Sequence, residues 1–72
     1  MIKISEDLKA CDATTACQIL EENAEDAWWF LQKNDAVYKH FCEVQMENDY
    51  SIAEYIWFYH WEEYIDFLLM EY

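Results

Sequence analysis

The segment SIAEYIWFYHWEEYIDFLLMEY, residues 51–72, indicates most clearly which fold the sequence encodes. Ser51 and Glu54 have the spacing of a capping box, in which each side chain accepts a backbone N–H at the start of a helix. The apolar residues that follow recur at the period of one helix face. The expected buried stripe consists of Ala53, Ile56, Trp57, Tyr64, Phe67 and Leu68. We therefore expect one long helix that begins at Ser51 and runs nearly to Tyr72.

The opposite face of this expected helix combines aromatic and acidic side chains, namely Tyr55, Tyr59, Glu62, Glu63 and Asp66. Exposed aromatic residues on a small domain often mark a protein interface. Carboxylates beside them attract a basic partner over a distance. This face is therefore the first candidate partner-binding strip.

Two helices are expected in the first half of the chain. Ser5 can cap a short first helix. A second helix is expected to begin between Asp12 and Thr15, because Thr15 and Gln18 stand in capping-box relation, and to end at about Lys33. Its apolar stripe consists of Ala16, Ile19, Leu20, Ala24, Ala27, Trp28 and Leu31.

A third long segment follows Asn34 and Asp35, which are typical of a helix end and a new start. This helix is expected to end near Asn48 and Asp49. Its inward residues are Val37, Phe41 and Val44.

The chain contains neither glycine nor proline, the residues on which tight hairpins and many sheet loops depend. Residues 1–4 could instead form an extended arm, but a single strand cannot form a sheet. The sequence therefore predicts an all-α fold, a compact bundle of three main helices with a short N-terminal helix. Residues 1–72 would form a single acidic domain.

Composition favours a folded chain over a disordered one. Of the 72 residues, 56% are hydrophobic, including four Trp, six Tyr and four Phe. Disordered segments lack such residues, whereas large rings compensate for the small core of a short chain.

The net charge is −12, because sixteen acidic residues face four lysines and no arginine. Nucleic acids and anionic membranes both require cationic side chains for binding. We therefore expect neither direct nucleic-acid binding nor membrane binding, and we expect any partner to be a basic protein.

Three cysteines without close spacing are a poor disulfide framework and suit a reducing compartment. The amino terminus lacks the apolar run of a signal peptide, and no segment approaches the roughly 20 apolar residues of a membrane span. The expected location is the cytoplasm.

Metal binding is the first chemical alternative. His40 and Cys42 form a close pair, while Cys11, Cys17 and His60 lie elsewhere. Structural zinc sites normally use two tightly spaced ligand pairs, and the glycine of a calcium-binding EF-hand loop is absent. We therefore expect no metal and no cofactor.

Catalysis is the second alternative. An acid pair such as Glu62 and Asp66 needs a pocket that shifts one pKa before it can act as acid and base. The sequence contains no nucleophile motif and no glycine-rich phosphate loop. The protein is therefore expected not to be an enzyme.

Acidic residues one helical turn apart are the most informative pattern. The expected helices contain the like-charged pairs Glu21–Glu25, Glu22–Asp26, Glu43–Glu47 and Glu62–Asp66. Each pair should destabilise its helix by about 0.2–0.5 kcal/mol, and carboxylates roughly 6 Å apart along a helix resemble neighbouring phosphates. Such rows could occupy a basic groove that normally holds DNA or RNA. The alternative is that they only keep an aromatic-rich protein in solution.

A second partner-binding strip would consist of Glu21, Glu22, Glu25 and Asp26. A different interface is also conceivable, because several aromatic residues lie off the expected stripes. These are Trp29, Phe30, Phe58 and Trp61. They suggest an adaptor, an antitoxin-like protein or a homodimer with an apolar contact.

As a whole, the chain resembles small phage-encoded inhibitors that mimic nucleic acid, such as anti-CRISPR proteins and inhibitors of restriction enzymes or DNA-repair glycosylases. The resemblance covers the entire chain and rests on its size, helical character, acidity and lack of Gly, Pro and Arg. It implies stoichiometric blocking of a host protein's nucleic-acid site in the host cytoplasm. The high Trp and Tyr content departs from pure charge mimicry and fits an additional hydrophobic anchor.

Overall fold

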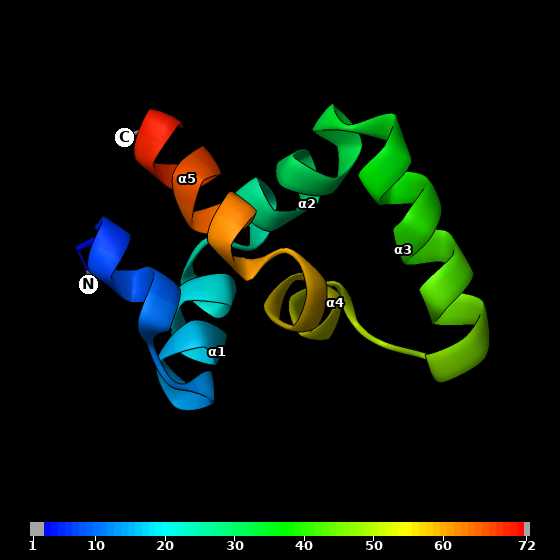
Figure 1. Ribbon diagram of the computed structural model, residues 1–72, viewed down its shortest axis with the longest axis horizontal. Helices are drawn as coiled ribbons and strands as arrows, with labels where there is room; N and C mark the ends of the chain where they lie inside the picture. The colour runs from blue at the N-terminus through cyan, green and yellow to red at the C-terminus, as the bar shows by residue number, and fades with distance from the viewer. Residues whose placement is uncertain (1–2, 72) are drawn as a thin grey trace.

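A computed structural model describes residues 3–71, which form helices and short connections without a strand. Within this range a short 3-10 helix precedes five α-helices (Figure 1). Their bounds are Glu6–Ala10 for η1, Ala13–Glu22 for α1, Ala24–Lys33 for α2, Asp35–Asn48 for α3, Ile52–Tyr59 for α4 and Trp61–Glu71 for α5. None of these helices is long and apolar enough to cross a membrane. The all-α prediction is confirmed for this range, while Met1, Ile2 and Tyr72, which belong to the expected arm and the last helix, lie outside it.

The expected bundle of three main helices is wrong in its helix count, because two of the three are divided. Asn23 separates α1 from α2, and His60 separates α4 from α5. Both residues have non-helical backbone angles, with φ −122° and ψ 40° at Asn23 and φ −135° and ψ 29° at His60. Asn and His are weaker helix formers than Ala or Leu, and each side chain here has a hydrogen-bond partner at the break.

Side-chain caps fix the starts of α3 and α4 as the sequence predicts. The Asn34 Oδ1 atom accepts the backbone N–H groups of Ala36 and Val37 at 3.0 and 3.4 Å. Ser51 and Glu54 form both hydrogen bonds of the capping box. These caps satisfy N–H groups that the first turn of a helix leaves without partners.

The second helix begins at Ala13, within the predicted range, but its cap differs from the predicted one. Asp12 caps α1, because its Oδ1 atom accepts the backbone N–H of Thr15 at 2.9 Å. Thr15 and Gln18 lie within α1, so the capping box predicted for them is wrong. Ser5 stands before η1 without a side-chain capping bond.

The core is formed by residues from all five α-helices. Its buried members are Ala16, Ile19, Leu20, Ala27, Leu31, Phe41, Val44, Tyr55, Ile56, Trp61, Tyr64, Ile65, Phe67 and Leu68. Most of the predicted stripes are therefore confirmed. Trp28 and Ala24 are exposed instead of buried, and Trp61 is buried although the pattern left it off the stripe. Trp61 lies four residues after Trp57 and three before Tyr64, so helical spacing alone places it beside the predicted stripe.

Contacts with α5 hold η1 in place, and the two segments lie side by side in Figure 1. The Trp61 indole N–H donates to the Leu8 carbonyl at 2.9 Å. Lys9 forms an ion pair with Asp66 at 2.8 Å. The described beginning and end of the chain therefore lie on the same side of the molecule.

Candidate protein-binding surface

The break between α1 and α2 gathers four acidic side chains around one hollow. Its lining residues are Glu21, Glu22, Asn23, Ala24, Glu25 and Asp26, and they enclose about 430 Å³. We call this feature the acidic hollow. It contains the complete second strip that the sequence predicts, with three of its acids exposed and Asp26 half-buried. The structure therefore brings these four acids together, although at a helix break instead of along one continuous helix.

Asn23 is fixed at the centre of the acidic hollow. Its side-chain Nδ2 atom donates to the Ile19 carbonyl at 2.9 Å. The backbone carbonyl of Asn23 accepts a hydrogen bond from the Tyr64 hydroxyl of α5 at 3.3 Å. Backbone bonds from Asn23 N to Ile19 O and from Ala27 N to Asn23 O continue across the break. The backbone at the centre of the four acids is thus held by the core and is not a loose loop.

Helix dipoles act in opposite directions on the two halves of the acidic hollow. Glu25 and Asp26 lie in the first turn of α2, where the positive end of the dipole stabilises carboxylates. Glu21 and Glu22 are the last residues of α1, where the negative end of the dipole repels them. Glu21 and Glu22 are therefore placed where folding alone does not favour acidic residues.

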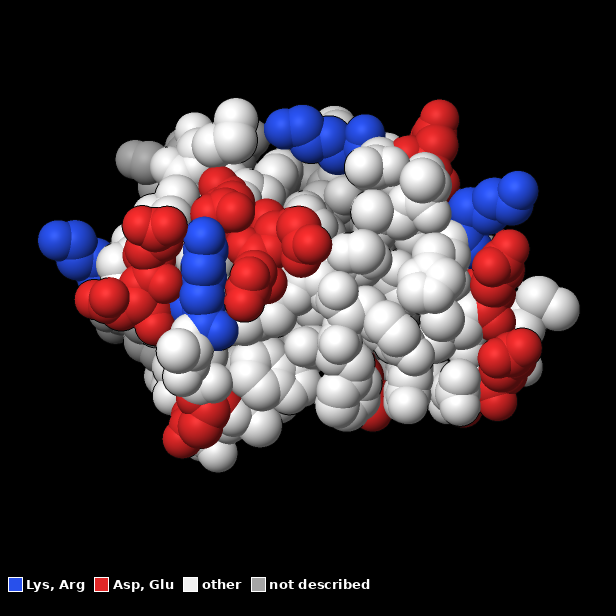
Figure 2. All heavy atoms as spheres, in the orientation of Figure 1, with Lys and Arg blue, Asp and Glu red and all other residues white. Residues whose placement is uncertain are grey.

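A second acidic surface lies on α5 and consists of Glu62, Glu63 and Asp66, which we call the α5 strip. All three side chains are exposed. Lys9 contacts Asp66 at 2.8 Å and Glu6 at 3.3 Å, and these two carboxylates raise the Lys9 pKa above its usual value. Figure 2 shows acidic side chains gathered around a lysine at the end of the molecule where η1 and α5 lie. The charge of the α5 strip is thus partly neutralised.

The two tyrosines predicted to accompany the α5 strip do not both belong to a surface. Tyr59 is 46% exposed, but Tyr55 is completely buried, so its assignment as a contact residue is wrong. Tyr55 stacks on Tyr59, with ring centroids 5.2 Å apart. The prediction placed Tyr55 on the polar face of one straight helix, but α3 covers that face, where Phe41 and His40 contact the Tyr55 ring.

Tyr55 joins α3, α4 and the His60 break through its hydroxyl group. The hydroxyl oxygen lies 2.7 Å from His40 Nδ1, 2.9 Å from His60 Nε2 and 3.4 Å from the Val37 carbonyl. A phenol has one proton to donate, so at least one of the two imidazoles must donate an N–H to it. Burial raises the pKa of Tyr55 to about 12, which keeps the hydroxyl neutral at ordinary pH.

The residues considered as metal ligands were two histidines and three cysteines. His40 and His60 both contact the Tyr55 hydroxyl, and all three cysteines are free thiols. Among the side chains that the structure describes, those of residues 3–70, no three His, Cys, Asp or Glu are grouped so that they could hold a metal ion.

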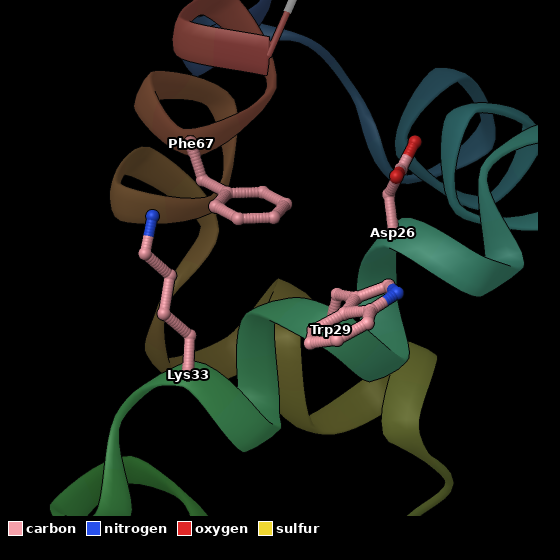
Figure 3. Close-up of a pocket in the computed structure, with 4 residues that line it drawn as sticks. All are labelled: Asp26, Trp29, Lys33 and Phe67. Atoms are coloured by element: carbon pink, nitrogen blue, oxygen red, sulfur yellow. The ribbon is translucent and has the colours of Figure 1, made fainter.

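An aromatic groove adjoins the acidic hollow. It lies between α2 and α5, is lined by Asp26, Trp29, Lys33 and Phe67, and has a volume of about 460 Å³. Figure 3 shows the Trp29 and Phe67 rings entering the groove from the two helices, with Asp26 near one end and Lys33 near the other. Asp26 lines both features, so the acidic hollow and the aromatic groove form one continuous surface.

The two rings of the groove differ in exposure. Phe67 is largely buried and is held edge-on by Phe30 at 5.6 Å, whereas Trp29 is 64% exposed. The Lys33 ammonium lies 5.2 Å from the centre of the Phe67 ring, within cation–π distance. Phe67 is thus a fixed wall and Trp29 an accessible one.

Sequence reasoning missed Lys33 and Phe67 as members of a surface site. The spacing of Asp26, Trp29 and Lys33 places them on one face of a helix, and this signal was available. The approach of Phe67 was not, because it depends on the packing of α5 against α2.

No protein-family model, no curated protein and no solved structure matches this chain. What the surface can bind must therefore be inferred from its own residues. Those residues include a cluster of carboxylates and an exposed indole, on helices that pack against the core.

Proposed function

We propose that this protein is a non-enzymatic inhibitor that binds a basic, nucleic-acid-binding protein through its acidic surface. The acidic hollow is the main contact, and the α5 strip is a second one. The partner's DNA- or RNA-binding groove is the surface that would accept these carboxylates. The single observation that carries the proposal is the gathering of four carboxylates around a break that the core holds rigid.

The placement of the acids favours binding over mere solubility. Charge needed only for solubility could be spread evenly and mixed with lysines. Here Glu21 and Glu22 are concentrated at a helix C-terminus that disfavours them. The backbone that carries these acids is held by the core, and the field of the clustered carboxylates attracts a basic partner. The net charge of −12 is consistent with binding to a basic protein and not to nucleic acid itself.

Capture from a lysate of the cell that encodes the protein, or of its host, tests the proposal. The hollow-neutral variant would carry Glu21→Gln, Glu22→Gln, Glu25→Gln and Asp26→Asn. The matched control would remove four acids elsewhere through Asp35→Asn, Glu43→Gln, Glu47→Gln and Asp49→Asn. We expect the wild type and the control to retain a basic nucleic-acid-binding protein that raised salt releases, because exposed charge pairs are screened. The hollow-neutral variant should bind that protein at least about tenfold more weakly.

Equal retention by the hollow-neutral variant would contradict the assignment of the acidic hollow. A salt-insensitive complex with a neutral protein, or with a second copy of the chain, would support the alternative of an adaptor or homo-oligomer. One observation favours that alternative, which is that Phe58 of α4 is 58% exposed and lies beside Tyr50, with ring centroids 5.3 Å apart.

A further inference from the structure

The two ends of the aromatic groove carry opposite charges. Asp26 and Lys33 are seven positions apart on α2, which corresponds to about 10.5 Å along the helix axis. The Asp26 end opens onto the acidic hollow, whereas the Lys33 end carries a cation already placed against Phe67. A bound cationic group is therefore favoured at the Asp26 end and repelled at the Lys33 end.

The exposed indole lies between these two ends, one helical turn beyond Asp26 (Figure 3). An indole face attracts cations and also stacks on flat groups. Arginine combines both properties, because its guanidinium is planar, charged and able to donate two parallel hydrogen bonds to a carboxylate. Lysine carries the same charge but offers no plane for stacking and holds its water more tightly.

We propose that the aromatic groove receives an arginine side chain of the basic partner. The guanidinium would stack on Trp29 and donate hydrogen bonds to the Asp26 carboxylate, with Phe67 as the back wall. This inference rests on the proposed function and adds an arginine-specific anchor to it. Arginine-rich surfaces are common where proteins bind phosphates, which makes arginine the side chain that a nucleic-acid-binding groove can supply.

Two peptides of equal length and charge, an oligo-arginine and an oligo-lysine, provide a test that requires no knowledge of the partner. Their dissociation constants would be measured at one salt concentration by isothermal titration calorimetry. We expect the wild type to bind the oligo-arginine about two- to five-fold more tightly than the oligo-lysine. Trp29→Ala should reduce this ratio to about one while it leaves oligo-lysine binding nearly unchanged.

Phe58→Ala is the matched control, because Phe58 is exposed to a similar extent, 58% against 64% for Trp29, and does not line the groove. This variant should keep the arginine preference. Urea unfolding of both variants would show that each remains folded, as expected for side chains that are mostly exposed.

The outcomes separate the two proposals. If wild type binds both peptides with equal affinity, or if Trp29→Ala keeps the preference, the arginine anchor is contradicted and the acidic docking surface remains. If neither peptide binds, the proposed function itself is contradicted.

Discussion

The two helix breaks of this molecule are alike in backbone geometry and opposite in surroundings. At Asn23 and at His60 the i to i−4 hydrogen bonds continue on both sides while one residue leaves the helical conformation. The Asn23 break faces carboxylates and an open hollow. The His60 break faces aromatic rings and the buried Tyr55 hydroxyl. The same kind of helix break thus faces the core at His60 and carries exposed acidic residues at Asn23.

This difference indicates which break serves stability and which one presents exposed side chains for the proposed binding. The polar atoms at His60 are used within the fold, since both nearby imidazoles contact Tyr55. Around Asn23, the side chains of Glu21, Glu22 and Glu25 are exposed and lie outside the buried core. Changes at the His60 break should therefore affect unfolding, and changes in the acidic hollow should affect partner binding.

Alkaline pH should produce the largest change in stability, and it should act through the His60 break. The pKa of Tyr55 is raised from 10.0 to about 12 in the folded state. The unfolded chain therefore loses this proton first, and the contribution of Tyr55 is complete below pH 10 and is lost as the pH rises to 12. A shift of that size corresponds to roughly 3 kcal/mol of unfolding free energy.

Urea unfolding of wild type and Tyr55→Phe over this pH range would check the prediction. Phe cannot ionise, so the variant should show a much smaller loss of stability as the pH rises. Tyr38→Phe is the control, because Tyr38 is partly exposed, takes no part in the hydrogen bonds of the Tyr55 hydroxyl and should leave the pH dependence intact. Equal slopes in wild type and Tyr55→Phe would show that Tyr55 does not carry the effect.

The smallest effect on stability is expected at the acidic hollow. Replacing Glu21 with glutamine removes its repulsion from Glu25 and from the negative end of α1, and should raise the unfolding free energy by no more than about 0.5 kcal/mol. Thermal unfolding followed by circular dichroism at low and high salt would measure it. A clear loss of stability would mean that the acids support the fold, and the contrast between the two breaks would then fail.

Helix ends marked by side-chain caps could be predicted from the sequence, and helix breaks could not. Asn34, Ser51 and Glu54 carry their signal in residue type and spacing, and the structure confirms it. Asn23 and His60 lie inside apolar periods that continue on either side, with no glycine or proline to mark a change of direction. The Asn23 carbonyl accepts the hydroxyl of Tyr64, 41 positions later, which no local pattern reveals. The His60 ring contacts the hydroxyl of Tyr55, which is five positions earlier but is held by α3.

The candidate surface was predictable to a similar degree. The four acids of the hollow were identified from their spacing, because nearby residues stay together whether or not the helix is continuous. Tyr55 was misplaced, and Phe67 was assigned to the core without its role as a wall of the groove. Tyr55 is buried by α3, and Phe67 reaches the groove because α5 packs against α2, so both positions depend on tertiary packing.

Competition with nucleic acid is the most direct test of the proposed function. A fluorescent duplex or RNA bound to the captured partner would be titrated with this protein while its anisotropy is followed. The proposal predicts that the nucleic acid is released as the protein approaches one equivalent of the partner, and that the hollow-neutral variant releases it only at much higher concentration. A stable ternary complex of partner, nucleic acid and this protein would contradict the claim that the acidic surface occupies a nucleic-acid site.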